Sequence, residues 1–216
     1  AGDTITAIDG IMNGTTNYIL TRMRKDGATF AAALAEAQTL GYAEANPEAD
    51  VDGLDAQRKI MILTAIATNM LADEKDVYTE TMTKVTPADM DAAARWGGTV
   101  KLLGSARISG EHASLYVCPV FVPGTSPLAN IDDVYNGIRF VSPVTADVMY
   151  YGRGAGRLPT AGAVVADIAA AASGLADREL PMEWENAPTG YVLPFSENVF
   201  SYYVRVKTDA VREMLE

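Results

Sequence analysis

The chain has 216 residues, of which 49% are apolar and 21% are charged, a mixture typical of a globular protein with a sizeable core. Its formal net charge of -11 argues against nucleic acid or an anionic membrane as a partner, because both attract concentrated lysine and arginine. No stretch approaches the roughly 18 consecutive apolar residues of a membrane span, and no basic start precedes an apolar signal region.

Cysteine and histidine are too scarce for a disulfide framework or a metal site. The single cysteine, Cys118, allows no intrachain disulfide and suits a reducing cytoplasm. It lies in the strand-like "SLYVCPVFV", which favours a buried, inert thiol over a nucleophile. The single histidine, His112, lies in a turn-like stretch with no second histidine or cysteine nearby. We therefore predict a cytoplasmic protein without a metal site.

The first elements are a strand and two helices. "TITAIDGIM" alternates enough to be a short strand, and the loop "NGTT" leads from it into the helical spacing of "NYILTRMRK". A second helix is predicted to begin after Thr29, an N-cap residue, and to end at Gly41, a typical C-cap. An acidic loop follows, in which Pro47 prevents a continuous helix.

Two more helices precede a change of pattern. The stretch 52–71 is predicted to be a long helix whose second half is apolar nearly all round, so we expect it inside the domain. Thr86 and Pro87 then begin a capped helix through "TPADMDAAARWG".

The second half of the chain is dominated by strands. Four strand-like stretches are separated by turn residues: "VKLLGSARIS", "HASLYVCPVFV", "DVYNGIRFV" and "DVMYYG". A glycine-rich turn and a covering helix follow in "RGAGRLPTAGAVVADIAAAAS", and "NVFSYYVRVK" is predicted to open a separate module with a strand. The order predicts an α+β fold with a mixed, largely antiparallel sheet, its helices on one face. The alternation of a doubly wound Rossmann domain is missing.

The spacing of Asp55 and Lys59 suggests a site. Residues four apart share one face of a helix, and a solvent-exposed ion pair is the usual reason for this spacing. Lys59, however, precedes the apolar run "IMILTAIA", so we expect it where the helix enters the interior. Burial and neighbouring carboxylates would then bring its pKa into the range for proton transfer. Glu44 and Asp50, on the preceding loop, are expected to fold over this face.

Two glycine-containing turns allow both a structural and a functional interpretation. Gly14 and Thr15 belong to the loop that leads directly into a helix, so their exposed amides can either serve simple capping or hold a small polar ligand. Gly152 and Gly154 belong to "GRGAGR", which is either a flexible turn or a loop whose amides approach a phosphate or carboxylate. It lacks the glycine spacing of a dinucleotide fingerprint.

Three long stretches resemble one family. "GIMNGTTNYIL", "LGYAEANPEADVDGLDAQRK" and "YYGRGAGRLPTAGAVVADI" are similar to the catalytic half of homoserine dehydrogenase, in the family's order and at similar spacings. The resemblance covers nearly residues 1–175. It implies interconversion of L-homoserine and L-aspartate 4-semialdehyde with NAD or NADP, on the route to threonine, methionine and isoleucine.

The resemblance also implies roles for single residues. Lys59 resembles the lysine that shuttles the proton of the substrate hydroxyl, and Asp55 its companion at that hydroxyl. Glu44 resembles the carboxylate that receives the substrate ammonium, with Tyr42 beside it and Asp50 nearby. Gly14 and Thr15 resemble residues that line the amino-acid end of the substrate. Gly152 and Gly154 resemble part of a loop that faces the cofactor.

The resemblance finally implies a domain organisation. Residues 1–180 would form the substrate and dimerisation domain, 181–197 a linker, and 198–216 the start of a truncated C-terminal ACT-like module. The N-terminal nucleotide-binding domain would be missing, so NAD or NADP would be bound mainly outside this chain and the fragment alone would be inactive. We expect a homodimer that pairs through the sheet. The alternative is a non-catalytic dimerisation or regulatory scaffold, and fusion to an aspartate kinase is left open.

Overall fold

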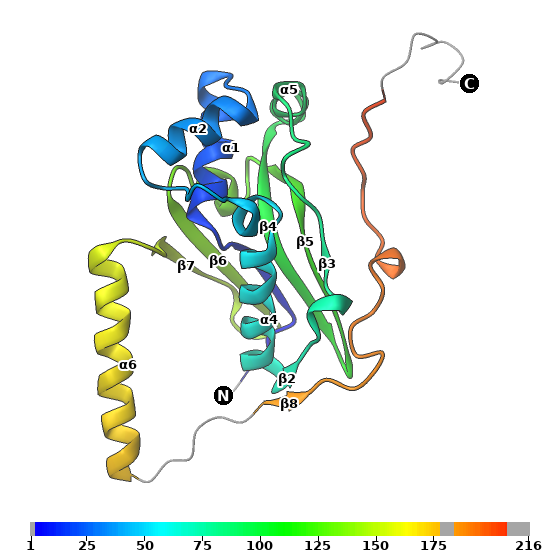
Figure 1. Cartoon of the computed structure of the whole chain (residues 1–216). Helices are drawn as coiled ribbons and strands as arrows, with labels where there is room; N and C mark the ends of the chain where they lie inside the picture. The colour runs from blue at the N-terminus through cyan, green and yellow to red at the C-terminus, as the bar shows by residue number, and fades with distance from the viewer. Residues whose placement is uncertain (1–2, 178–183, 207–216) are drawn as a thin grey trace.

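A computed structural model of the chain describes residues 3–177 and 184–206 and contains one six-stranded sheet with helices on one face (Figure 1). The strands of this sheet are β1 (Ala7–Ile11), β3 (Tyr78–Thr79), β4 (Gly98–Ser109), β5 (His112–Pro123), β6 (Tyr135–Ser142) and β7 (Ala146–Arg153). Their spatial order is β3-β5-β4-β1-β6-β7, and every pair is antiparallel except β3 with β5. A separate parallel pair joins β2 (Met70–Leu71) to β8 (Glu185–Asn186). The predicted α+β class with a mixed, largely antiparallel sheet is confirmed.

The helices begin and end largely where capping residues predict. They are α1 (Gly14–Asp26), α2 (Phe30–Thr39), α3 (Glu48–Val51), α4 (Leu54–Thr68), α5 (Pro87–Arg95) and α6 (Arg157–Asp177). Thr29 caps α2 through its side chain, and Thr86 forms a capping box with Asp89 at the start of α5. Within the described ranges, no helix is long and apolar enough to cross a membrane.

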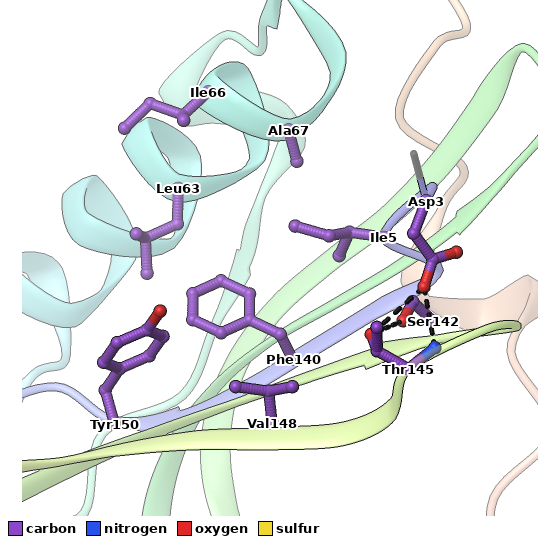
Figure 2. A pocket seen from close by; sticks show the side chains of 10 residues that line it. All are labelled: Asp3, Ile5, Leu63, Ile66, Ala67, Phe140, Ser142, Thr145, Val148 and Tyr150. Carbon is purple, nitrogen blue, oxygen red and sulfur yellow. Dashed lines mark hydrogen bonds between the residues drawn. The ribbon is translucent and has the colours of Figure 1, made fainter. Parts of the chain in front are cut away.

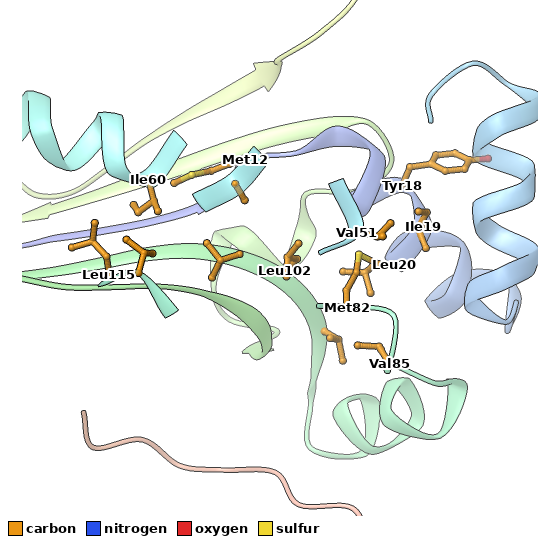
Figure 3. Packing of buried hydrophobic residues seen from close by; sticks show 14 of the residues in the cluster. Met12, Tyr18, Ile19, Leu20, Val51, Ile60, Met82, Val85, Leu102 and Leu115 are labelled. Atoms are coloured by element: carbon orange, nitrogen blue, oxygen red, sulfur yellow. The ribbon is translucent and has the colours of Figure 1, made fainter. Parts of the chain in front are cut away.

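The main core lies between the sheet and helices α1 and α4 (Figure 3). Ile8 and Leu102 project from neighbouring strands of the sheet, while Ile60 projects toward them from α4 and is fully buried. Side chains approach β4 closely at Gly104, where a Cβ would stand 2.9 Å from the sulfur of Met12 and 3.4 Å from Ile60, so the flexible Met12 side chain would have to move. Full burial of one such aliphatic side chain contributes about 1.5–3 kcal/mol.

The buried stripe of α4 sets the direction of its polar residues. Ala56, Ile60 and Thr64 are buried at intervals of four residues, so this face packs on the sheet. Ile62 and Ile66, in contrast, are 44% and 55% exposed. The expectation that the second half of this helix lies inside the domain was therefore wrong: one face is packed and the opposite face is uncovered in this chain.

Two C-terminal segments also differ from expectation. Helix α6 stands away from the sheet in Figure 1, and its apolar side chains Leu158, Val165 and Ile168 are all more than half exposed, so it is not a covering helix here. The strand expected from Asn198 is not formed by residues 199–206. The ring of Tyr203 in this segment stacks on Phe121 of β5 instead of the backbone pairing with a neighbouring strand. The rest of the expected module, 207–216, lies outside the described residues.

Candidate active site around Lys59

Four side chains from three parts of the chain meet at the end of β1, and we call them the acid cluster: Asn13, Asp50, Asp55 and Lys59. Asn13 follows β1 and is the N-cap of α1. Its side-chain nitrogen Nδ2 donates to Asp50 Oδ1 at 2.7 Å and to Asp55 Oδ2 at 2.8 Å. Asp50 belongs to the short helix α3, and Asp55 to the first turn of α4. Tertiary packing thus brings together the two acids that the sequence nominated.

Lys59 lies one helical turn beyond Asp55. Its Nζ donates to Asp55 Oδ2 at 2.7 Å and to the backbone carbonyl of Met12 at 2.9 Å. The predicted i,i+4 pairing is therefore confirmed. The expected burial of Lys59 was wrong, since its side chain is 48% exposed. The reason is geometric: Lys59 lies beside the buried stripe of α4 and extends along the rim of the domain.

The hydrogen-bond inventory of the acid cluster shows what remains available. An ammonium group carries three donors, and Lys59 uses two of them within the protein. Among the described residues, Asp55 Oδ1 and Asp50 Oδ2 have no hydrogen-bond partner. One donor and two acceptor oxygens are thus free to bind a small polar molecule that carries both a hydroxyl and an ammonium group.

The start of α1 and the loop before α3 lie against each other. Thr15 Oγ1 donates to the carbonyl oxygen of Tyr42 at 2.6 Å, and the Tyr42 ring meets the Tyr18 ring edge-on at 5.0 Å. A Cβ at Gly14 would stand 2.8 Å from the carbonyl oxygen of Val134, so only glycine allows the loop before β6 to approach this closely. The sequence-predicted residues Gly14, Thr15 and Tyr42 therefore border one region.

Glu44 is not joined to the acid cluster. Its side chain is exposed and has no hydrogen-bond partner among the described residues, while its backbone carbonyl accepts from Gln38 Nε2 at 3.1 Å. Its carboxylate is available for a ligand but is not held in place by the described residues.

The glycine-rich turn lies at the same end of the sheet. Ile11 of β1 is in register with Gly137 of β6. Asn136, the residue before Gly137, is in register with Gly152 of β7. Since neighbouring strands lie about 4.8 Å apart, Gly152 stands roughly two strand spacings from the end of β1. The Gly154 amide donates to Asn136 Oδ1 at 3.3 Å, and this turn leads directly into α6. The turn thus flanks the acid cluster.

Comparisons with known proteins identify the family of this chain. The profile described as homoserine dehydrogenase matches residues 1–169. The chain belongs to the homoserine dehydrogenase family. A homoserine dehydrogenase from Neisseria gonorrhoeae is 41% identical over 213 residues, which cover 96% of this chain and 49% of that protein. The crystal structure of a homoserine dehydrogenase from Thiobacillus denitrificans is similar with a TM-score of 0.82 and 37% identity, covering 89% of this chain and 46% of that one.

The chain spans about half the length of the homoserine dehydrogenases that it matches. A further solved relative is a hyperthermophilic archaeal homoserine dehydrogenase mutant in complex with NADPH. It is 26% identical with a TM-score of 0.65, and the match covers 84% of this chain and 50% of that one. The matched region is the part that carries the acid cluster and the glycine-rich turn.

A separate hollow of about 360 Å³ lies further along α4 (Figure 2). Leu63 and Ile66 of α4 face Phe140, Val148 and Tyr150 of the β6–β7 hairpin across it. Leu63 is one helical turn beyond Lys59. Apart from Asp3, Ser142 and Thr145 at one end and the hydroxyl of Tyr150, the lining is apolar. It therefore offers packing surface and not the polar chemistry of the acid cluster.

Two polar residues were missed by the sequence analysis. Asn13 was read only as part of a loop, although an asparagine directly before a helix is a recognisable N-cap. Lys101 lies in the apolar strand β4, where a lone charge is itself unusual, and its side chain is only 1% exposed. Burial lowers the pKa of Lys101 to about 8, and the nearby carboxylate of Asp132 opposes this shift.

His112 is exposed as the sequence predicted, whereas Cys118 is half-buried and not fully buried as expected. Burial, followed by the charge of Glu80, raises the pKa of the Cys118 thiol to about 12, so the reactive thiolate is scarce at neutral pH. His112 is exposed, and its Nδ1 lies 3.2 Å from the carbonyl oxygen of Gly190. Within the described part of the chain, no three histidine, cysteine, aspartate or glutamate side chains group together as metal ligands would.

Proposed function

We propose that the protein catalyses the NAD- or NADP-dependent interconversion of L-homoserine and L-aspartate 4-semialdehyde, with this chain as its substrate-binding and catalytic domain. The observation that carries the proposal is the free third donor of Lys59, held by Asp55 and the Met12 carbonyl in a member of this family. The proposal places the protein in the cytoplasm, on the route to threonine, methionine and isoleucine.

Lys59 is the proposed proton shuttle. In the reductive direction, its third N–H gives a proton to the oxygen that becomes the substrate hydroxyl. In the oxidative direction, a neutral Lys59 amine receives the hydroxyl proton. Asp55 and the Met12 carbonyl accept the two remaining N–H groups in either state, so the lone pair stays directed away from them. Asp55 Oδ1 is free to accept from the same hydroxyl.

The amino-acid end of the substrate is assigned to the other free groups. The free oxygen of Asp50 and the exposed carboxylate of Glu44 suit the substrate ammonium group. Gly14 and Thr15 begin α1, where unpaired amides and the helix dipole favour the substrate carboxylate, and Tyr42 borders the same region.

The glycine-rich turn fits one side of a nicotinamide ring. No heavy atom lies within 4 Å of the position that a Cβ at Gly152 would take, so a planar ring can approach this backbone. Gly154 has its amide oriented by Asn136. When bound, NAD or NADP accepts a hydride from the carbon that bears the substrate hydroxyl. We propose that the half of the protein outside this chain holds most of the cofactor.

We also propose a homodimer that pairs through the sheet face opposite the helices. A hollow of about 300 Å³ on this face is lined in part by Val120, Tyr116, Arg107 and Arg139. Both arginines bind the buried Asp9 at 2.8 Å, which balances charge on a surface that a second copy would cover. Sedimentation that finds only monomers at high concentration would contradict this assignment.

The proposed domain division is 1–180 for the catalytic domain, 181–197 for a linker and 198–216 for the start of an ACT-like module. It is supported by the end of the family match at residue 169 and of α6 at Asp177.

The test uses a full-length protein in which this chain is joined to the remaining half found in its relatives. Reduced nicotinamide should appear when homoserine and either NAD or NADP are supplied, and disappear when the semialdehyde is supplied. No homoserine-dependent turnover with either cofactor would contradict the proposal and favour a scaffold role.

A further inference from the structure

The side chain of Asn13 forms three hydrogen bonds at once: both of its donors are used, and its oxygen accepts one bond. Its Oδ1 accepts from the Thr16 amide at 2.9 Å as the N-cap of α1. Its two Nδ2 protons go to Asp50 and Asp55. The residue is 8% exposed, so water does not compete strongly for these bonds.

The orientation of the Asn13 amide follows from its partners. Turning the amide by half a turn would place its oxygen against the two carboxylates and its NH₂ group against the N–H of Thr16. All three contacts would become repulsive, so the donors must face Asp50 and Asp55. The amide group that caps α1 therefore also holds the carboxylates of Asp50 and Asp55.

The contacts also decide which carboxylate oxygens are free. Asn13 and Lys59 both bind Oδ2 of Asp55, and Asn13 binds Oδ1 of Asp50. Among the described residues, Oδ1 of Asp55 and Oδ2 of Asp50 are then left without a partner. Two neighbouring carboxylates repel each other, and a neutral group with two donors is a suitable bridge between them. A second lysine there would compete with Lys59 for Asp55.

We propose that Asn13 is a positioning residue for the reaction, which holds Asp50 and Asp55 at one spacing and so aims Asp55 and Lys59 at the substrate hydroxyl. This rests on the proposed function for the identity of the substrate. Asn13 itself touches neither the reacting carbon nor the hydroxyl; it acts through Asp55. The resemblance of "GIMNGTTNYIL" to the family implies roles for Gly14 and Thr15 but none for Asn13.

Two variants of the full-length protein separate the hydrogen bonds from Asn13 to Asp50 and Asp55 from its role as the N-cap of α1. Asn13→Asp retains an excellent N-cap but cannot donate, and Asn13→Ser retains a cap but can donate only one proton. Because displacement of a catalytic group by about 1 Å can cost about 10²-fold, kcat should fall by about that factor in both. The KM for homoserine should rise as well, because Asn13 also holds Asp50, whose free oxygen is assigned to the substrate ammonium group.

Thr29→Ala is the matched control for a loss of helix capping, because Thr29 caps α2 and contacts no residue of the acid cluster. It should lower the melting temperature while kcat and the pH profile of kcat remain unchanged. Wild-type kcat and an unchanged pH profile in Asn13→Asp would overturn the proposal.

A crystal structure of the Asn13→Ser variant gives a readout that does not depend on activity. The Asp50 and Asp55 carboxylates should move apart, and Lys59 should leave the Met12 carbonyl. If both carboxylates and the ammonium keep their positions, the proposal fails whatever the reaction is. An inactive wild-type protein would contradict the proposed function, and this structure would still decide the role of Asn13.

Discussion

Two lysine–aspartate pairs each contact α1 or its N-cap and differ in burial and in the number of hydrogen bonds that the lysine makes. Lys59 binds Asp55 at 2.7 Å, and the two side chains are 48% and 31% exposed. Lys101 lies 3.5 Å from Asp132, and its own side chain is 1% exposed. Both lysines also donate to a backbone carbonyl, Met12 for Lys59 and Ile131 for Lys101.

The number of donors in use explains why only one pair suits a reaction. Lys101 donates to Asn17 Oδ1 at 3.0 Å, to the Ile131 carbonyl and to Asp132, so its three N–H groups are all used within the protein. Lys59 uses two and keeps the third. Burial makes Lys101 part of the packing between α1, β4 and the loop before β6, whereas partial exposure leaves Lys59 available to a substrate.

The sharpest way to break this comparison is to truncate Lys59. Lys59→Ala in the full-length protein should lower kcat by about 10²–10⁴-fold, because the proton shuttle is lost. Its free energy of unfolding should change by less than about 1 kcal/mol, since both side chains of the pair are partly exposed to solvent. Steady-state kinetics and urea unfolding measure the two effects.

Lys75→Ala is the matched control for that experiment, because Lys75 forms an exposed pair with Asp73 at 2.9 Å and shares no hydrogen bond or ion pair with the acid cluster among the described residues. Its kinetics should equal those of the wild type. A Lys59→Ala variant with wild-type kcat would keep the family assignment and refute the mechanism.

Lys101→Met should show the reverse pattern. Removal of the ammonium leaves Asn17 Oδ1 without its donor, and a buried group left without a partner costs about 1–3 kcal/mol. The Ile131 carbonyl also loses Lys101 but still accepts from Asn17 Nδ2 at 3.0 Å. Asp132 retains Arg24 at 2.6 Å and Lys25 at 3.0 Å, so its charge stays compensated. We expect a total loss of roughly 1–3 kcal/mol in urea unfolding. A loss no greater than that of Lys59→Ala would show that the two lysines are energetically equivalent.

The pH dependence of stability sharpens the same contrast. The pKa of Lys101 is lowered by burial to about 8, whereas an unfolded lysine titrates near about 10.4. Between these values the unfolded chain binds more protons, so stability should rise with pH through this window. Below about pH 8 the cost of burying the charge is present in full.

The measurement is the difference in unfolding free energy between wild type and Lys101→Met at about pH 7.5 and about pH 10. The difference should grow in favour of the wild type at the higher pH. Subtracting the unfolding free energy of the variant from that of the wild type cancels the titration of tyrosines and of other groups that both proteins share. A constant difference would mean that Lys101 has the same pKa in both states.

The smallest effect is expected on the free energy of unfolding when the ion pair between Asp55 and Lys59 is removed. Asp55→Asn keeps the shape of the side chain and should change the unfolding free energy by only about 0.3–0.5 kcal/mol, as for other exposed pairs one helical turn apart. A loss of several kcal/mol would show that Asp55 has a structural role like that of the Lys101 cluster.

Local rules account for much of what the sequence determined. Thr29 and Thr86 mark helix starts through capping, and alternation identifies β4 to β7, because both depend on neighbours in the chain. The spacing of Asp55 and Lys59 places them on one helix face without any tertiary information. The three motifs likewise identified the family, since their order and spacing are properties of the chain itself.

Tertiary structure alone decided which polar residues are buried and which ones meet. Asn13 binds acids 37 and 42 residues away, and Asn17 meets a lysine 84 residues away, distances at which no local pattern operates. The rotation of α4 on the sheet leaves Lys59 exposed, while β4 carries Lys101 into the interior. The physical reason is that helix and strand periods depend on adjacent residues, whereas burial depends on packing between elements distant in the chain.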